Sequence, residues 1–194
     1  MAVPPPRPNR VILDKPALRA RLRADRDRFA AESVTAITAP DTYIARLKPG
    51  MVVATYHPIG SEADPALLAA AAAERGCSLA LPHVVDRAAP IRFLAWDPEV
   101  PLVAGPFGLR QPEAASPELA PDVILTPLVG FDRRLNRLGQ GAGHYDRAFA
   151  RYEAAWRVGV AWSVQEVPAI PADIWDVPLN AVITEEAMLC HEEA

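Results

Sequence analysis

A segment dense in glycine and arginine follows an apolar run and limits the folds open to this chain. The apolar run is Val123–Leu125, and the segment 131–147 reads FDRRLNRLGQGAGHYDR. It contains three alternate glycines and four flanking arginines, namely Gly139, Gly141, Gly143, Arg133, Arg134, Arg137 and Arg147. Glycine lets backbone N–H groups approach an anion, which a helix N-terminus and arginine side chains also attract. The pattern therefore predicts a strand, a phosphate-binding loop and then a helix over His144–Ala154.

The spacing of the glycines separates this loop from two common nucleotide-binding motifs. No Gly-Lys-Ser/Thr follows, so the loop is not a Walker loop, and G-x-G-x-G differs from the Rossmann spacing G-x-G-x-x-G. Asp146 adds a hard carboxylate beside the expected anion, in a place that suits Mg²⁺. The alternative, a solvated glycine turn between a strand and a helix, explains less of so dense a pattern.

Apolar strands alternate with helical stretches along most of the chain. We expect strands at Met51–Tyr56, Ser78–Leu81, Ile91–Trp96, Val100–Val103, Asp122–Thr126, Arg157–Ala161 and Ala181–Thr184. We expect helices from Lys15, capped by Asp14, to about Ala36, and at Asp41–Leu47, Pro65–Arg75 and His144–Ala154. The alternation predicts an α/β fold, a three-layer sandwich whose largely parallel central sheet is covered by helices on both faces. Ligands of such sheets bind at strand carboxyl ends, so the loops after Tyr56 and Thr126 should share one rim.

Composition and charge narrow the classes of function. The 194 residues suit a single domain, expected over 15–194 after a proline-rich arm at 1–14. A hydrophobic content of 51% argues against general disorder, and a net charge of −4 argues against a dedicated nucleic-acid binder. No apolar run approaches the ~20 residues that cross a bilayer, and Met1–Arg10 precedes no apolar signal core. With Cys77 and Cys190 lacking a C-x-x-C partner, we expect a cytoplasmic protein with reduced thiols, which binds neither nucleic acid nor membrane.

Residues 131–147 resemble the signature of the 5-formyltetrahydrofolate cyclo-ligase family, F-D-R-x-G-x-R-L-G-x-G-G-G-Y-Y-D-R. The chain matches at Phe131, Asp132, Arg133, Arg137, Leu138, Gly139, Gly141, Gly143, Tyr145, Asp146 and Arg147. It departs at Leu135, where glycine is usual, and at Ala142 and His144. The resemblance implies an ATP- and Mg²⁺-dependent enzyme that converts 5-formyltetrahydrofolate to 5,10-methenyltetrahydrofolate and releases ADP and phosphate. The formyl oxygen would be phosphorylated and then displaced by attack of N10.

The resemblance also implies which residues meet each substrate. For ATP these are Lys15, Pro16, Ala17, Leu18, Arg19, Arg137, Leu138, Gly139, Gln140, Gly141, Ala142, Gly143, His144 and Tyr145. For the folate they are His57, Glu62, Gln140, Gly141, Ala142, Gly143 and His144. The charge of the transferring phosphoryl group would be neutralised by Arg137, Lys15 and Arg19. Magnesium would be held by Asp146 and Asp176, with Asn180 replacing the second aspartate of a D-x-x-x-D element.

Several other interpretations stay open from the sequence alone. Sugar-phosphate isomerases and CoA transferases have similar folds, and a phosphate loop does not exclude them. The departures at Leu135, Ala142 and Asn180 are also compatible with a relative that binds folate or nucleotide without turnover. One face of the expected first helix is basic and comprises Lys15, Arg19, Arg23 and Arg26. Such a face is commonly just solvated. An RNA-binding role for it lacks support, because no aromatic residues are interleaved with the basic ones. We expect a monomer or a weak dimer.

Overall fold

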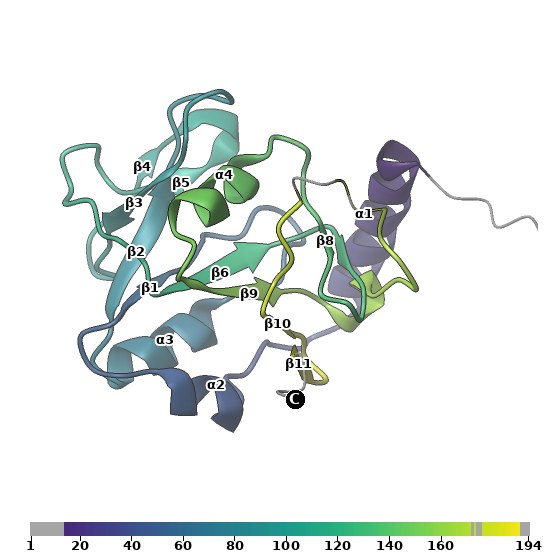
Figure 1. Cartoon of the computed structure of the whole chain (residues 1–194), viewed down its shortest axis with the longest axis horizontal. Helices are drawn as coiled ribbons and strands as arrows, with labels where there is room; N and C mark the ends of the chain where they lie inside the picture. The colour runs from purple at the N-terminus through teal and green to yellow at the C-terminus, as the bar shows by residue number, and fades with distance from the viewer. Residues whose placement is uncertain (1–13, 172, 174–175, 191–194) are drawn as a thin grey trace, which may run out of the picture.

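A seven-stranded sheet forms the centre of the protein. The computed structural model describes residues 14–171, 173 and 176–190, so that the predicted proline-rich arm, except Asp14, lies outside it. The strands of the sheet are β1 (Val52–Ala54), β2 (Ser78–His83), β3 (Arg92–Ala95), β6 (Val123–Pro127), β9 (Trp156–Val160), β10 (Ala181–Ile183) and β11 (Met188–Cys190). Their order is β11-β10-β9-β6-β1-β2-β3, and only the edge strands β3 and β11 run antiparallel to their neighbours in this sheet (Figure 1).

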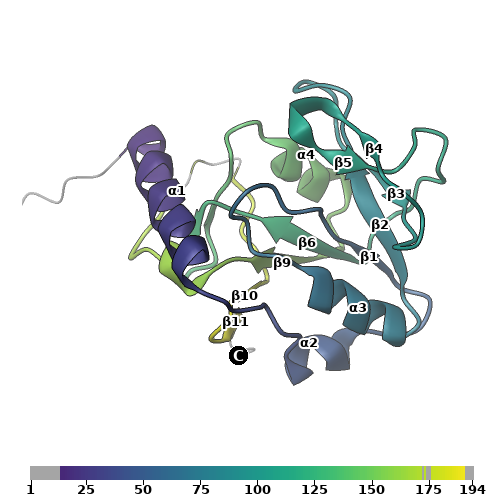
Figure 2. The same ribbon diagram turned by 180° about the vertical axis from the view of Figure 1, so that it is seen from behind.

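Helices cover both faces of this sheet, as the two opposite views show (Figure 1, Figure 2). The helices are α1 (Lys15–Glu32), α2 (Asp41–Arg46), α3 (Ala66–Glu74) and α4 (His144–Arg151). Successive residues of a strand point to opposite faces, so Val123 and Leu125 of β6 pack in the cluster with α2 and α3. Ile124 packs on the other face, in the cluster with Phe149 of α4. The predicted three-layer α/β sandwich with a largely parallel sheet is confirmed.

Short elements complete the described part of the chain. They are β4 (Val103–Ala104), β5 (Arg110–Gln111), β7 (Gly130–Phe131), β8 (Arg137–Leu138) and the 3-10 turns η1 (Pro106–Gly108) and η2 (Ser163–Gln165). Strands β4 and β5 form one antiparallel hairpin, and β7 and β8 form another. No described helix has the length and apolar character needed to cross a membrane.

Helix α1 begins where the sequence predicts and ends earlier. The Asp14 carboxylate accepts a hydrogen bond from the Ala17 N–H over 2.9 Å, which satisfies one of the free N–H groups of the first turn. Leu18 and Leu22 are buried against the β7–β8 hairpin and the residues after η2. The helix stops at Glu32, not near Ala36, because Ser33 is already extended and Val34, the next apolar residue, is fully exposed and adds nothing to this interface.

The sheet reverses its direction of winding between β1 and β6. From β1 the chain passes through α3 to β2, and from β6 it passes through α4 to β9 on the opposite side. Strands β1 and β6 are parallel neighbours, with Val53 opposite Val123 and Ala54 opposite Ile124. Their following loops therefore leave the sheet at the same edge, as predicted, and open the crevice in which sheets of this kind bind ligands.

The β7–β8 hairpin is a feature that the sequence analysis missed. We expected a continuous loop from Phe131 onward, but a buried aspartate organises the first part of it. The Asp132 carboxylate accepts hydrogen bonds from the backbone N–H groups of Arg134, Asn136 and Ile170, at 2.9, 3.1 and 2.9 Å. These bonds close a tight turn and join it to a distant segment, so local sequence patterns do not reveal them.

Three other expectations about the strands and helices need correction. The expected strand Val100–Val103 is wrong, because only Val103 pairs, in β4, and Pro101 has no N–H to donate to a neighbour. Helix α4 ends three residues before the expected Ala154, at Arg151. Strand β11 was not predicted, and it extends the sheet through antiparallel pairing with β10.

Leu135 lies in the left-handed region of backbone conformation, with φ of +62°, and its side chain is 1% exposed. This is the position at which glycine is usual in the resembling family. We predict that Leu135→Gly and Leu135→Ala both lower the free energy of unfolding, because each removes buried apolar groups worth about 2–5 kcal/mol. Glycine should be the more stable of the two by about 1 kcal/mol, because alanine keeps the strain of the positive φ. Urea denaturation of the three proteins measures this order, and an alanine variant at least as stable as the glycine variant would contradict it.

Candidate functional site

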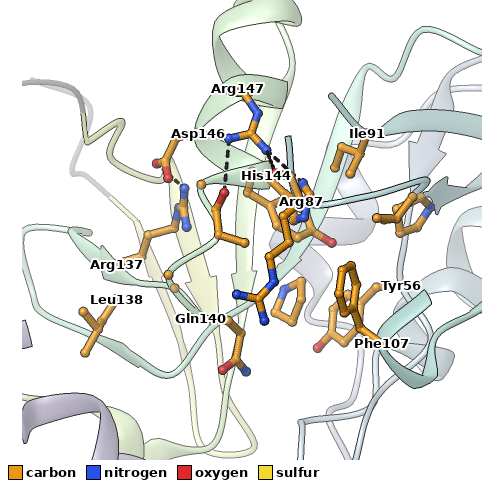
Figure 3. Close-up of a pocket in the computed structure, with 18 of the residues that line it drawn as sticks. Tyr56, Arg87, Ile91, Phe107, Arg137, Leu138, Gln140, His144, Asp146 and Arg147 are labelled. Atoms are coloured by element: carbon orange, nitrogen blue, oxygen red, sulfur yellow. Dashed lines mark hydrogen bonds and ion pairs between the residues drawn. The ribbon is translucent and has the colours of Figure 1, made fainter. Parts of the chain in front are cut away.

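A cavity of about 850 Å³ opens at the carboxyl ends of β1 and β6 (Figure 3). Its walls come from α1, the loop after β1, the β7–β8 hairpin, the glycine loop and the first turn of α4. Most of the predicted site residues line it, although they come from distant parts of the chain. They are Lys15, Arg19, His57, Glu62, Arg137, Leu138, Gly139, Gln140, Gly141, Ala142, Gly143, His144, Tyr145, Asp146 and Asp176.

Three of the residues that the resemblance assigns to ATP are not among those lining the cavity. Leu18 is buried beneath the β7–β8 hairpin, whereas Pro16 and Ala17 are exposed. Residues four apart share one face of a helix, which is why α1 turns both Lys15 and Arg19 toward the cavity. The structure therefore brings the two basic side chains of this turn to the cavity and leaves the residues between them outside.

Only some positions of the glycine loop have a backbone conformation that favours glycine. Gly141 and Gly143 have φ of +104° and +68°, a region that side chains disfavour, whereas Ala142 is not among the residues with positive φ. The departure at Ala142 therefore adds no backbone strain. Arg19 Nε donates to the Gly139 carbonyl over 2.8 Å, and Arg147 Nη1 donates to the Ala142 carbonyl over 3.1 Å. Two arginines thus fix the loop from either side.

Gly143 immediately precedes α4, so the free N–H groups of the first helical turn lie at the cavity wall. The residues of this turn, His144, Tyr145 and Asp146, all line the cavity. An α-helix carries partial positive charge at its N-terminus, which favours an anion there. This confirms the predicted order of strand, loop and helix and gives the cavity one end that suits phosphate.

Arg137 and Asp146 form an ion pair at this end of the cavity. Arg137 Nη2 donates to the Asp146 carboxylate, and the dashed line in Figure 3 joins the two groups. The Arg137 side chain is only 6% exposed, and its guanidinium lies over the Phe149 ring at 4.9 Å from the centroid. The buried Arg137 Nε has no hydrogen-bond partner among the described residues. Arg137 therefore presents a largely desolvated positive charge with donor capacity to spare.

Lys15 is held between two carboxylates, those of Asp173 and Asp176. Its ammonium nitrogen lies 2.6 Å from Asp173 Oδ2 and 2.7 Å from Asp176 Oδ2. Partial burial lowers the pKa of Lys15, but the two carboxylates outweigh this and leave its pKa above the ordinary value. Burial raises the pKa of Asp176, but the Asp173 N–H, Lys15 and Arg137 outweigh this and leave its pKa below the usual range. Both groups are therefore charged at neutral pH.

Asp146 and Asp176 are the carboxylates that the sequence analysis assigned to Mg²⁺. Both line the cavity, and both interact with Arg137, so they face the same volume. Among the described residues, no cluster of three or more His, Cys, Asp or Glu side chains could hold a metal by itself. A pair of carboxylates still fits Mg²⁺, because this ion commonly takes its other ligands from water and from substrate phosphates. The donor set is thus compatible with a metal that arrives with a nucleotide.

Asn180 has a structural role in this chain. Its Oδ1 accepts the Arg157 N–H over 2.8 Å, and its own N–H donates to the Arg157 carbonyl over 2.8 Å. It thereby joins the start of β10 to β9, and it is not among the residues that line the cavity. The asparagine at this position therefore leaves the pair of candidate metal ligands unchanged.

Glu62 lies on the loop after β1, within the same cavity. Its side chain is 8% exposed, its Oε2 accepts the Ile59 N–H over 3.1 Å, and its Oε1 accepts from Gln140 Nε2 over 3.1 Å. The second bond joins the loop after β1 to the glycine loop. His57 lines the cavity as well but is exposed. The two segments that the sequence analysis assigned to the folate are therefore in direct contact.

The far wall of the cavity is formed by residues that the sequence patterns did not single out. Phe107 has φ of +60° and is 55% exposed, and the Arg87 guanidinium lies 5.4 Å from its ring centroid (Figure 3). Ile91, Leu109 and Arg110 complete this wall. The sequence had pointed to no site residue in the β4–β5 region. The available sequence signal was Phe107, which stands between Pro106 and Gly108. A tight turn lies at the surface, so an aromatic side chain in it is exposed and available to line a site.

His144 occupies the centre of the cavity wall next to Arg147. Its Nδ1 lies 3.0 Å from Arg147 Nη2, which also donates to the Arg87 carbonyl over 3.0 Å. Burial lowers the pKa of His144, and the neighbouring charges of Arg147 and Arg87 lower it further, against a smaller opposing effect of Asp86. The imidazole is therefore neutral at pH 7 and can accept the arginine hydrogen bond through Nδ1.

Comparison with known proteins agrees with this geometry. A 5-formyltetrahydrofolate cyclo-ligase from Mycolicibacterium smegmatis is 37% identical over 146 residues, which is 70% of this chain and 74% of the relative. A cyclo-ligase from Haemophilus influenzae is 38% identical over 97 residues, 47% of this chain, and the match spans about half of that relative's length, 52%. The solution structure of 5,10-methenyltetrahydrofolate synthetase from Aquifex aeolicus superposes with a TM-score of 0.68 and 27% identity, covering 94% of this chain and 95% of that one.

The match to a family model extends over nearly the whole chain, from residue 11 to residue 185. It includes α1, the loop after β1, the glycine loop and Asp176, which are the parts that meet around the cavity. The family that the glycine loop indicates is therefore confirmed: the chain belongs to the 5-formyltetrahydrofolate cyclo-ligase family.

Proposed function

We propose that this protein converts 5-formyltetrahydrofolate to 5,10-methenyltetrahydrofolate, with hydrolysis of ATP to ADP and phosphate in the presence of Mg²⁺. The observation that carries the proposal is that one cavity joins two kinds of binding group. The glycine loop, the α4 N-terminus and Arg137 suit nucleotide phosphates, and Glu62 beside them suits a ring that donates hydrogen bonds. Membership of the cyclo-ligase family supports the same assignment.

The chemistry requires activation of an unreactive group. The nitrogen lone pair of an N-formyl group delocalises onto the carbonyl, so the oxygen is hard to expel. Transfer of the γ-phosphoryl group of ATP to this oxygen turns it into a good leaving group. N10 then attacks the formyl carbon, the N10 proton is lost, and phosphate departs with the former formyl oxygen. No covalent bond to the protein is needed, so the protein's task is placement and charge compensation.

The phosphate end of the cavity would provide this charge compensation. Arg137, Lys15 and Arg19 would contact phosphate oxygens, together with N–H groups of the glycine loop. In the free protein Arg137 and Lys15 are paired with carboxylates, so a nucleotide would exchange protein anions for phosphate oxygens. Asp146 and Asp176 would hold Mg²⁺, which supplies positive charge to the same oxygens when bound.

The other end of the cavity would orient the folate. The Glu62 carboxylate accepts one protein hydrogen bond on each oxygen, which leaves lone pairs for N–H groups of a reduced pterin ring. Gln140 contacts Glu62 and belongs to the glycine loop, so it lies where the two substrates would meet. His57 and His144 would complete the folate contacts at the cavity wall. This arrangement would bring the formyl oxygen close to the γ-phosphate.

We also propose that residues 15–194 act as one domain, in the cytoplasm. Lys15 and Asp176 come from nearly opposite ends of the chain and form one ion pair, which supports a single functional unit. Cys77 and Cys190 are both free thiols, as suits a reducing compartment.

The proposal predicts formation of the methenyl product only in complete mixtures. Purified protein with ATP, Mg²⁺ and 5-formyltetrahydrofolate should generate its absorbance, and omission of any one component or addition of excess EDTA should abolish it. Binding of either substrate without turnover would instead indicate a relative that has kept the fold and lost the reaction. Activity on a sugar phosphate in place of the folate would indicate the isomerase alternative.

Replacing Asp146 should weaken the binding of Mg²⁺. We predict that Asp146→Asn lowers turnover at least roughly 100-fold and raises the Mg²⁺ concentration needed, because the amide lacks the negative charge that the ion requires. Asp41→Asn is the control, because Asp41 is an exposed aspartate of α2 that does not line the cavity and should leave turnover and the Mg²⁺ dependence unchanged. Turnover measured against Mg²⁺ concentration distinguishes the two. Wild-type turnover of Asp146→Asn at saturating Mg²⁺ would remove Asp146 from the metal site.

Replacing Glu62 should act on the folate rather than on the nucleotide. We predict that Glu62→Gln raises the KM for 5-formyltetrahydrofolate roughly tenfold, because an amide loses one charged acceptor at a desolvated position. The KM for ATP should change little. Glu74→Gln, at an exposed glutamate of α3, serves as a control and should match the wild type in both constants. A raised KM for ATP with an unchanged KM for folate would reverse the assignment of the two ends.

A further inference from the structure

The second half of α1 contains a buried arginine that the reaction, as derived above, does not use. The sequence placed Arg26 on a basic helix face, where a solvated side chain is the ordinary expectation. Instead its side chain is 8% exposed and reaches the loop after β1, where its Nε donates to Ser61 Oγ over 2.9 Å. Its Nη1 lies 3.9 Å from Glu62 Oε1 and has no hydrogen-bond partner among the described residues.

A guanidinium buried in this way needs a nearby negative charge, because loss of hydration costs several kcal/mol for an isolated ion. The Glu62 side chain is equally buried, at 8% exposure, and forms an ion pair with the unpaired end of Arg26. Each of the two groups therefore compensates the burial of the other. The unpaired Nη1 of Arg26 thus lies within ion-pair distance of the carboxylate that would receive the pterin ring.

The same segment is fixed from its other sides. Asp27, the next residue of α1, hydrogen-bonds with Ser61 Oγ, and Trp162 Nε1 donates to the Ser61 carbonyl over 3.0 Å. From the glycine loop, Gln140 contacts Glu62 through its amide nitrogen, and Arg23 of α1 donates to the Gln140 amide oxygen, with the closer nitrogen at 2.6 Å. One face of α1 thus supports both loops that meet at Glu62.

We propose that Arg26 is a positioning residue for folate recognition, acting through Glu62. It holds the Glu62 carboxylate in place at the cavity, so that both oxygens can accept N–H groups of the substrate. This inference rests on the function proposed above, and it goes further by giving α1 a role at each end of the cavity. Lys15 and Arg19 serve the nucleotide, and Arg26 sets the acceptor for the folate.

The test compares Arg26→Met with Arg26→Lys. Methionine keeps an unbranched apolar stem and removes the charge, whereas lysine restores the charge without the Nε bond to Ser61. We expect Arg26→Met to raise both the Kd and the KM for 5-formyltetrahydrofolate roughly tenfold, with the KM for ATP within about twofold of the wild type. Arg26→Lys should recover a substantial part of the loss. Arg28→Gln is the control, because Arg28 is 66% exposed and pairs only with Asp25 among the described contacts, at 3.6 Å.

Direct titration of each protein with 5-formyltetrahydrofolate, without ATP, separates this inference from the proposed function. If the wild type binds the folate without turnover, the proposed reaction fails while the comparison of Arg26 variants still decides the positioning role. Folate affinity unchanged in Arg26→Met overturns that role. An equal loss of ATP and folate binding, or no recovery in Arg26→Lys, also overturns it, because either result means that Arg26 only supports the fold. A wild type that binds no folate overturns both.

Discussion

The parallel pairing of β1 with β6 is the constraint on which the rest of the site depends. Because these neighbours point the same way and the winding of the sheet reverses between them, the chain segments after them open side by side. One segment carries Glu62 and the other carries the hairpin and the glycine loop. Helix α1 then spans both, through Arg19 at the Gly139 carbonyl and Arg26 at Ser61. The cavity is thus a consequence of topology, and side chains adapt it to anions.

Charge balance within the cavity is the second organising principle. The cations assigned to phosphate are not free in the described structure, since Arg137 is paired with Asp146 and Lys15 with Asp173 and Asp176. These pairs keep desolvated charges compatible with folding before any ligand arrives. A ligand that brings both phosphate and a divalent cation offers phosphate oxygens to Arg137 and Lys15 and a cation to the carboxylates, so every charged group keeps a partner of opposite sign. A phosphate without its cation would leave the carboxylates facing an anion.

Much of the site could be predicted from sequence because its signals are local. Alternate glycines before a helix, basic residues four apart on α1 and a glutamate after an apolar strand each belong to one short segment. The features that were missed depend on contacts between distant segments. Asp132 organises a hairpin by reaching Ile170, Arg87 meets Phe107 across two loops, and the burial of Arg26 requires the loop at Ser61. Periodicity describes one element at a time and carries no information about such contacts.

Leu135 shows that this turn can form without the glycine that is usual at its position. Here a leucine takes the left-handed conformation, its side chain fills the core beside α4, and the Asp132 carboxylate supplies the hydrogen bonds that define the bend. In this chain the turn is therefore stabilised by the surrounding structure rather than by the conformational freedom of a glycine. A sequence pattern that requires glycine at position 135 would therefore fail to detect this chain. Asp132, three positions earlier, is the better marker of the hairpin.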